Sequence, residues 1–247
     1  MNQYRRFFFI GLALVSGVIF LTACGIIPNT IKGTGDLVRV EMSFTGITEV
    51  ALATHGELVI ELGEEEHLII EAQENLQQYI EAGLVNGKLT IESKDGVNII
   101  PTKPIRYLLT VKSIQTLAVT SVGTISAPAL EVDHFRVEIA STGDIHIDSL
   151  IAETLEVSLV SVGNLEIASG QVETQEITIK SAGSYIAGDM RSAEAAVDIT
   201  SSGDVTLWAT DRLEVTIRSS GDVKYYGSPV VTTNITSSGS VTHLGDK

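Results

Sequence analysis

The sequence predicts an all-β protein: a single-stranded, parallel β-helix-like solenoid of about 20-residue coils, preceded by a less regular N-terminal capping segment. Two observations predict it. A Ser-x-Gly triplet recurs at a nearly constant interval that shortens slightly after Gly203, and apolar and polar residues alternate around each triplet. Such alternation is typical of strands that bury one face. The triplets are Ser121/Gly123, Ser141/Gly143, Ser161/Gly163, Ser181/Gly183, Ser201/Gly203, Ser219/Gly221 and Ser237/Gly239.

The equivalence of neighbouring repeats favours a solenoid over successive antiparallel hairpins. In a solenoid each residue stacks on its counterpart one coil along, roughly 4.8 Å away, whereas hairpins would make odd and even strands differ. The parity of Leu155, Val157 and Leu159 predicts that the serine and the glycine of each triplet point inward from a bent strand. Glycine there permits a sharp bend and a close approach beside a narrow core. We expect the serines to be structural rather than nucleophilic, because none has a positioned base.

The N-terminus has the features of a lipoprotein signal peptide over residues 1–23. Arg5 and Arg6 precede an apolar run, residues 7–21, and small residues then lead to Cys24. The run is shorter than the ~20 residues of a spanning helix. Leu-Thr-Ala-Cys resembles the bacterial lipobox, so we expect lipid on Cys24 and a cell-envelope location facing outside the cytoplasm. The alternative is an unmodified cysteine inside a membrane helix.

Three further segments follow the signal peptide. Residues 24–36 are expected to form a lipidated, flexible tether, because turn-forming Pro and Gly residues cluster there. Residues 37–112 are expected to form the N-terminal β segment and cap, and residues 113–247 the solenoid repeats. Within the cap we expect strand-like runs at 37–44, 50–62 and 67–71, a helical turn at 74–80, and a tight hairpin at Asn86-Gly87.

The charge of the chain limits its partners. Loss of residues 1–23 removes two arginines and no acid, which leaves 14 basic and 31 acidic side chains and a net charge of −17. Such a field repels phosphate backbones. It also repels anionic lipid head groups. We therefore expect no nucleic-acid partner, and a membrane link through the lipid on Cys24.

Polar side chains after the glycines suggest no metal site by themselves. Asp204 and Asp222 are expected on adjacent coils, where calcium could bind, but a ladder that caps backbone amides is favoured, and the question of calcium stays open. The five histidines lie apart in the sequence, so no metal and no cofactor is expected. Glu138, Glu156, Glu176 and Glu214 have outward parity, and paired carboxylates would be needed by a glycosidase.

Trp208 and Tyr226 form the best candidate binding surface. Both have outward parity, and their separation in the sequence equals the local coil length. An exposed aromatic pair suits sugar rings or a partner protein. The alternative is that a C-terminal loop covers the pair.

The chain resembles the bacterial family called putative auto-transporter adhesin, head GIN domain, a domain of unknown function. The resemblance spans roughly residues 40–240. It rests on Phe44 and Ile47 ahead of Gly56, on the segments 74–76 and 85–91, and on the serial Ser-x-Gly-Asp-Val coils. It implies a β-solenoid in the cell envelope with an adhesin-like role, and it supplies no catalytic residues.

The sequence therefore predicts a non-enzymatic envelope lipoprotein that presents a β-solenoid surface for adhesion or for protein or glycan binding. One alternative is a carbohydrate-active β-helix enzyme, a polysaccharide lyase or hydrolase. Another is an envelope scaffold that assembles end to end through open coils.

Overall fold

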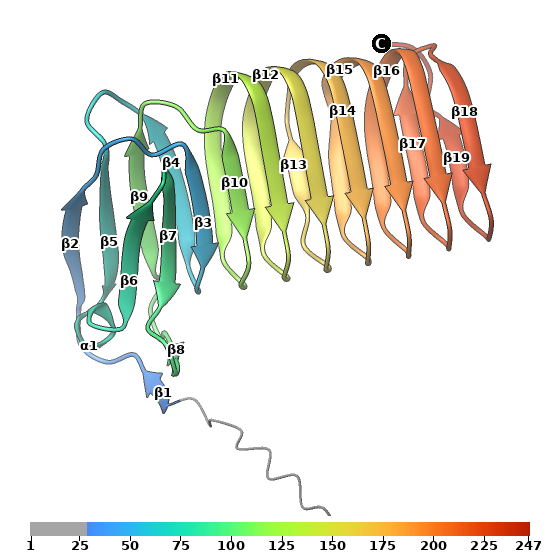
Figure 1. Ribbon diagram of the computed structural model, residues 1–247. Coiled ribbons are helices and arrows are strands. Elements are labelled where there is room, and N and C mark those ends of the chain that lie inside the picture. Colours follow the sequence, from blue (N-terminus) through green and yellow to red (C-terminus); the bar gives the residue numbers. More distant parts are fainter. Residues whose placement is uncertain (1–28) are drawn as a thin grey trace, which may run out of the picture.

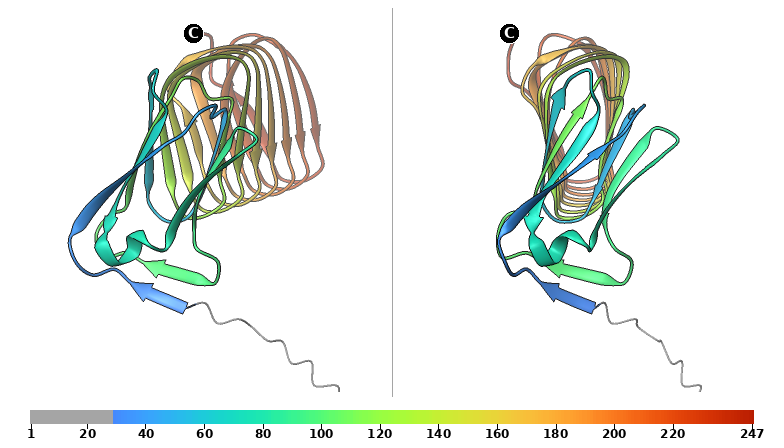
Figure 2. Two further views of the ribbon diagram at one scale, coloured as in Figure 1. Left: turned by 60° about the vertical axis from the view of Figure 1, so that its left-hand side comes forward. Right: turned by 90° about the vertical axis from the view of Figure 1, so that its left-hand side faces the viewer.

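The computed structural model describes residues 29–247, so the expected signal peptide and Cys24 lie outside the described residues. The chain forms a stack of parallel coils with a group of partly antiparallel strands at its N-terminal end (Figure 1). The predicted solenoid fold and the capping segment are confirmed. Figure 2 shows that the coils superimpose as flattened loops when viewed along the stack.

Some coils of the array are each one long bent strand, namely β11 (Thr124–Ile139), β12 (Asp144–Leu159), β15 (Ser184–Ile199) and β16 (Asp204–Ile217), and the other coils are divided into shorter strands. The pairings within the array are parallel, with Thr124 beside Asp144 among the longer coils and Asp204 beside Asp222 among the shorter ones. The predicted stacking of equivalent residues is therefore confirmed. The shorter strands are β10 (Thr116–Val119), β13 (Leu165–Ile167), β14 (Gly170–Ile179), β17 (Asp222–Tyr226), β18 (Val230–Ile235) and β19 (Ser240–His243).

The stacking continues into the N-terminal segment. β3 (Glu49–Ala53) pairs in parallel with β10, and β4 (Glu57–Leu62) pairs in parallel with β11, so these strands form the first coil. The expected single run over 50–62 is thus two strands, because the chain turns at Gly56, whose φ is 130°. A side chain there would also lie 2.7 Å from the ring of Tyr107.

Further strands cover this first coil: β7 (Lys88–Ser93) and β9 (Arg106–Val111) pair with it in parallel, and the strands outside them pair antiparallel. On one side β9 pairs with β4, β5 (His67–Gln73) pairs with β9, and β2 (Leu37–Ser43) pairs with β5. On the other side β7 pairs with β3, and β6 (Ile80–Val85) pairs with β7. The helical turn is shorter than expected: α1 (Glu74–Gln77) ends before β6 begins.

The β6–β7 hairpin confirms the interpretation of Asn86-Gly87. Asn86 has a φ of 51° and Gly87 a φ of 83°. Two-residue hairpin loops favour positive φ at both positions because this backbone matches the twist of the strands.

Part of the expected tether is a strand. β1 (Asn29–Lys32) pairs in parallel with β8 (Val97–Ile100). The glycines and Pro28 indicated flexibility, but the backbone groups of Asn29–Lys32 gain hydrogen bonds to β8 instead. The first described residues are thereby fixed to the capping segment.

The interior of each coil is filled by the inward side chains of its strand. Ile145, Leu165 and Tyr185 occupy one inward position on successive coils and are almost completely buried. Burial of apolar area at roughly 25 cal/mol per Å² is the main favourable term for such a core. The alternation seen in the sequence therefore gives one continuous core along the stack.

The triplet glycines lie in the turns between strands, not within a bent strand as expected. None of them has a positive φ, so the turn itself does not require glycine. The close approach of neighbouring coils does require glycine. A Cβ at Gly183 would lie 2.5 Å from the carbonyl oxygen of Gly163 and 3.1 Å from that of Ser161. The expected role in a sharp bend is therefore corrected to a role in backbone contact between coils. The seven glycines are Gly123, Gly143, Gly163, Gly183, Gly203 and Gly221, which are buried, and Gly239 in the last coil, which is partly exposed.

The same contact recurs along the stack. A Cβ at Gly143 would lie close to the carbonyl oxygen of Gly123, and one at Gly239 would lie 2.5 Å from that of Gly221. At Gly203 the nearest atom to the added Cβ would be Cγ2 of Ile179. Each glycine is thus required by the coil before it.

The serines of the triplets lie in a different environment from the glycines. Ser181 is partly exposed, as are the serines of the other interior triplets, and Ser237 in the last coil is exposed. The expectation that the serines point inward is therefore wrong, because the strand ends before them and its alternation stops at the turn.

Candidate functional site

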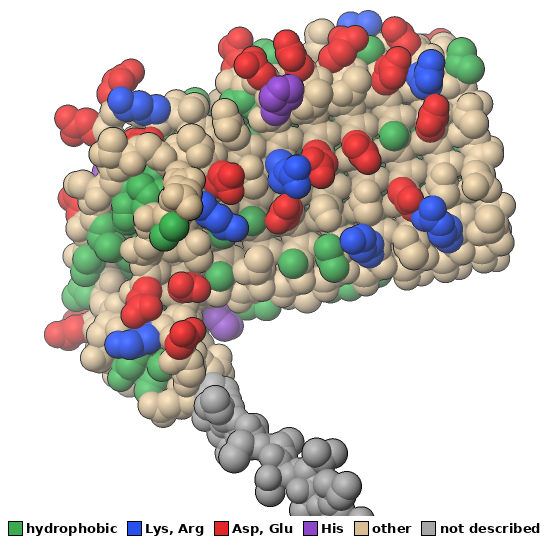
Figure 3. Space-filling model, in the orientation of Figure 1, with side chains coloured by type: hydrophobic (Ala, Val, Ile, Leu, Met, Phe, Trp, Pro, Cys, Tyr) green, Lys and Arg blue, Asp and Glu red, His purple; other side chains and the backbone are tan. Residues whose placement is uncertain are grey.

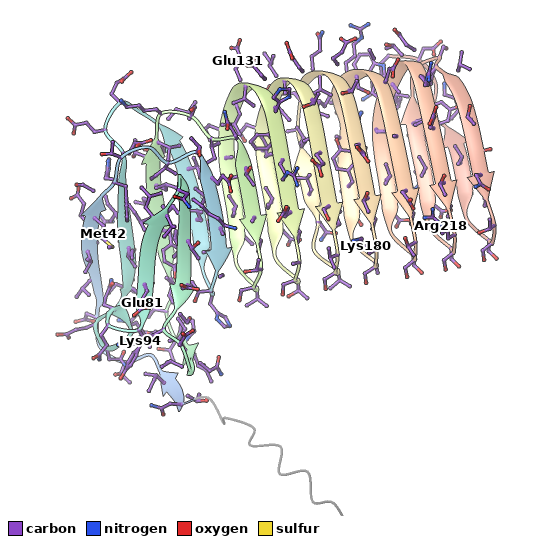
Figure 4. All side chains as sticks on the ribbon, in the orientation of Figure 1. Met42, Glu81, Lys94, Glu131, Lys180 and Arg218 are labelled. Atoms are coloured by element: carbon purple, nitrogen blue, oxygen red, sulfur yellow. The ribbon has the colours of Figure 1, made fainter. Side chains whose placement is uncertain are left out.

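The outward side chains at one edge of the solenoid form a continuous row over six coils, which we call the edge row. Each member pairs with the next across adjacent strands. Glu131 lies at the upper edge of the stack, where the row begins (Figure 4). The edge row consists of Glu131, Ile151, Gln171, Arg191, Trp208 and Tyr226.

A bulge brings Trp208 into this row. The register between β15 and β16 moves from Ala187/Leu207 to Arg191/Trp208, so the residues between Ala187 and Arg191 have no counterpart in β16. One of them, Met190, is completely buried. Trp208 therefore lies beside Arg191, and Tyr226 lies directly beside Trp208. The structure brings the two predicted aromatic residues together.

Two glycines make room for the aromatic rings. A Cβ at Gly188 would lie 3.2 Å from Cε2 of Tyr226. A Cβ at Gly227, whose φ is 91°, would meet the carbonyl oxygen of Ala209 first and would also lie 3.0 Å from Cδ1 of Trp208. Both rings are partly exposed and lie outside the buried cluster. The rings are therefore seated on the surface in defined positions.

The C-terminal segment covers Tyr226 in part. The Lys247 ammonium lies 4.0 Å from the centroid of the Tyr226 ring, within the range of a cation–π contact. The same ammonium donates to the carbonyl oxygen of Gly188 at 2.8 Å and forms an ion pair with Asp189 at 2.5 Å. The sequence left open whether the aromatic pair is exposed or covered by a C-terminal loop. The C-terminal residue Lys247 covers part of Tyr226.

A buried polar chain supports Trp208 from beneath. The Tyr185 hydroxyl donates to Oε1 of Gln175 at 2.7 Å, and Nε2 of Gln175 donates to Oγ of Ser192 at 2.7 Å. Ser192 Oγ in turn donates to the carbonyl oxygen of Trp208 at 2.9 Å. All three side chains are buried, and burial raises the pKa of the Tyr185 phenol far above its usual range. The sequence analysis did not predict these buried hydrogen bonds. The residue that indicated them is Gln175, a polar side chain at an inward position between Leu155 and Ala195.

Three of the outward glutamates, Glu156, Glu176 and Glu214, lie on a different surface and line a hollow of about 460 Å³. Glu156 and Glu176 are neighbours on adjacent strands, and Glu156 is held by Arg136 at 2.6 Å. Acidic and basic side chains are interspersed on the face shown in Figure 3. The carboxylates stand side by side on one sheet instead of facing each other across a cleft, as the pair of a glycosidase does.

The polar side chains after the glycines cap backbone groups of the next coil. Oδ1 of Asp144 accepts the Asn164 amide at 2.9 Å, and Oδ1 of Asn164 accepts the Ser184 amide at 3.2 Å. Oδ1 of Asp222 accepts the Ser240 amide at 3.1 Å. Within residues 29–247 there is no group of three or more His, Cys, Asp or Glu side chains arranged to hold a metal ion.

The family model described as putative auto-transporter adhesin, head GIN domain, matches residues 44–229. A putative adhesin from Bacteroides fragilis matches the fold with a TM-score of 0.80 and 20% identity, covering 87% of this chain and 100% of that chain. A putative lipid binding protein from Parabacteroides distasonis gives 0.71 and 22%, covering 87% and 100% of the two chains. A putative adhesin from Parabacteroides merdae gives 0.70 and 19%, covering 87% and 99%. No curated protein matches the chain.

At these identities the likeness of the solved structures concerns the fold alone. In the part of the chain that the structure describes, no helix has the length and apolar character needed to cross a membrane. The family match and the geometry of the edge row are the two findings that bear on function.

Proposed function

The chain belongs to the putative auto-transporter adhesin, head GIN domain family, and from this premise we propose that it is a non-enzymatic adhesin of the cell envelope. In this proposal lipid on Cys24 anchors the chain to a membrane, and the edge row binds a neutral glycan chain. The single observation that carries the proposal is the placement of Trp208 directly beside Tyr226, with both rings partly exposed.

The chemistry of the edge row supports glycan binding. Aromatic rings provide a flat apolar surface with a polar edge, and such residues contribute a large share of binding energy at interfaces. Gln171 and Arg191 continue the row and provide hydrogen-bond donors beside Trp208. Because the strands are roughly 4.8 Å apart, these groups form a line suited to an extended ligand.

Charge favours a neutral ligand over an anionic one. The chain has 31 acidic and 16 basic side chains, a formal net charge of −15. A field of this sign repels sulfated or carboxylated sugars at long range. Hydrogen bonds and stacking, which need no charge on the ligand, then supply the attraction.

The position of the row fits an anchor near the N-terminus. The described chain begins with β1, which pairs with β8 at the opposite end of the molecule from β18 and β19 (Figure 1). Trp208 and Tyr226 belong to the last coils. An anchor joined to β1 would therefore leave the aromatic pair directed away from the membrane.

An array of immobilised neutral and anionic glycans tests the proposal. We expect the chain to be retained by a subset of neutral glycans, and the double variant Trp208→Ser/Tyr226→Ser to bind them about tenfold more weakly or worse, since aromatic anchors contribute about 1–2 kcal/mol or more. The control Val122→Ser/Val162→Ser changes two exposed apolar residues outside the row and should bind normally. Retention by anionic glycans alone, or equal retention of the two double variants, would contradict the proposal.

A further inference from the structure

The C-terminal end of the solenoid is an open strand edge. β18 pairs with β16 and β19 pairs with β17, and no other described strand pairs with either of them. The core is also open here: Ile235 is 38% exposed, whereas Ile217, its counterpart one coil earlier, is fully buried. Outer backbone groups and inward side chains of the last coil therefore both face solvent.

This edge lacks the charged side chains that normally prevent strand pairing. Proteins protect edge strands with charges, above all lysine, with proline or with bulges. Residues 225–245 contain no Lys, Arg, Asp or Glu, in a chain with 31 acidic and 16 basic side chains. Figure 3 shows neither red nor blue side chains over the outermost coil on the face that it presents. The last coil is thus neutral and β18 has no proline within it.

The edges at the other end of the molecule are protected. β2 pairs with β5 alone among the described strands, and it carries Arg39 and Glu41. β6 pairs with β7 alone among them, and it carries Glu81, which is labelled at this end in Figure 4. The edges of β2 and β6 are thus charged, whereas the C-terminal edge of the solenoid is not, which favours pairing through the C-terminal end.

We propose that this end binds a second copy of the chain, so that two solenoids join C-terminal end to C-terminal end as a closed dimer. Two copies repel each other through their acidic sides, and the neutral last coil is the surface where they meet without repulsion. Identical surfaces that meet about a two-fold axis form a closed dimer, whereas contacts between different surfaces form rings or filaments.

The sequence of β18 suits pairing with itself. A two-fold axis makes the two β18 strands antiparallel, and inward residues must lie opposite inward residues, because a slip of one residue reverses the faces. Val231, Thr233 and Ile235 are the inward positions, since they pair with Leu213, Val215 and Ile217 of β16. An axis at Thr233 therefore places Val231 opposite Ile235 of the second copy and Thr233 opposite itself. This register continues the core across the junction.

In an anchored chain the dimer would have a further consequence, which rests on the proposed function. The two N-terminal ends would lie at opposite ends of a rod of doubled length. Anchored copies that pair in this way would therefore join two facing membranes.

Sedimentation of the purified full chain in non-ionic detergent tests the dimer. We expect a concentration-dependent change from monomer to dimer and no larger species. Thr233→Lys places like charges opposite each other at the axis and should weaken association about tenfold or more. Thr142→Lys, at an exposed turn of an interior coil, is the matched control and should associate like the unaltered chain.

Disulfide trapping tests the register. Thr233→Cys should form a cross-linked dimer under mild oxidation, since directly opposite Cβ atoms lie about 4.5–5.5 Å apart. Val122→Cys, at an exposed turn, should not, and the unaltered chain shows any contribution of Cys24. A monomer at all concentrations, filaments, or equal association of the two lysine variants would overturn the proposal. Thr233→Lys should leave retention on glycans intact, so failure of the dimer and failure of the glycan site can be distinguished.

Discussion

Substitution of Gly183 by alanine should destabilise the solenoid strongly although it adds one methyl group. The new Cβ would lie 2.5 Å from the carbonyl oxygen of Gly163 and 3.1 Å from that of Ser161. Carbon–oxygen contacts are normally about 3.3 Å or longer, so two backbone segments must separate by almost an ångström. The expected loss is about 2 kcal/mol, in the range for overpacked interiors. In a chain of this size it corresponds to a decrease in melting temperature of about 4–8 °C.

The matched control is Gly83→Ala in β6, where a Cβ would meet no atom within 4 Å. Alanine there should leave stability unchanged or raise it by up to about 1 kcal/mol, because it restricts the unfolded chain. Urea unfolding followed by circular dichroism gives the midpoints of both variants. Equal midpoints would show that the turns do not stack backbone to backbone, and the account of the repeat would be wrong.

Three further predictions concern the core and the anchor. Tyr185→Phe removes the donor to buried Gln175 and should cost about 1–3 kcal/mol of unfolding free energy; an unchanged urea midpoint would contradict a stabilising role for the polar chain. Burial raises the pKa of Tyr185 and Tyr107 above the usual 10.0, so the unfolded chain ionises first. Stability should be independent of this ionisation below pH 10 and fall above it, by up to about 1.4 kcal/mol per pH unit for each tyrosine, and the slope should decrease in Tyr185→Phe; equal slopes would refute this. Cys24→Ala should abolish labelling of the chain with radioactive palmitate and its retention by membranes, because Cys24 is the only cysteine; normal cleavage and retention would refute the anchor.

The repeat was predictable because it depends on a local rule that is repeated. A strand that buries one face must alternate, and a triplet at a fixed interval must stack on itself. Glycine at residue 183 was therefore recognisable as structural from the sequence. The sequence could not show which atoms lie too close to residue 183 for a side chain. That contact joins two backbones, and it depends on the register between neighbouring coils.

The remaining features depend on contacts between distant segments. The pairing of β1 with β8 joins segments on either side of most of the cap, and nothing in Asn29–Lys32 alone indicates it. The place of Trp208 beside Arg191 depends on the bulge in β15, which the shortening of the repeat after Gly203 signalled without locating it. The alternation of inward and outward residues was enough to predict that Trp208 and Tyr226 are neighbours. Both residues follow the bulge, and their separation in the sequence equals the length of the coil between them.

The fluorescence of Trp208 tests the proposed glycan site most directly, because Trp208 is the only tryptophan in the chain. The full chain is titrated with the neutral glycan that it retains most strongly on the array. We expect a saturable change in emission whose midpoint equals the affinity measured on the array, and loss of this response in Tyr226→Ser, which keeps the fluorophore. Saturable glycan binding with unchanged Trp208 emission would place the site elsewhere and contradict the account.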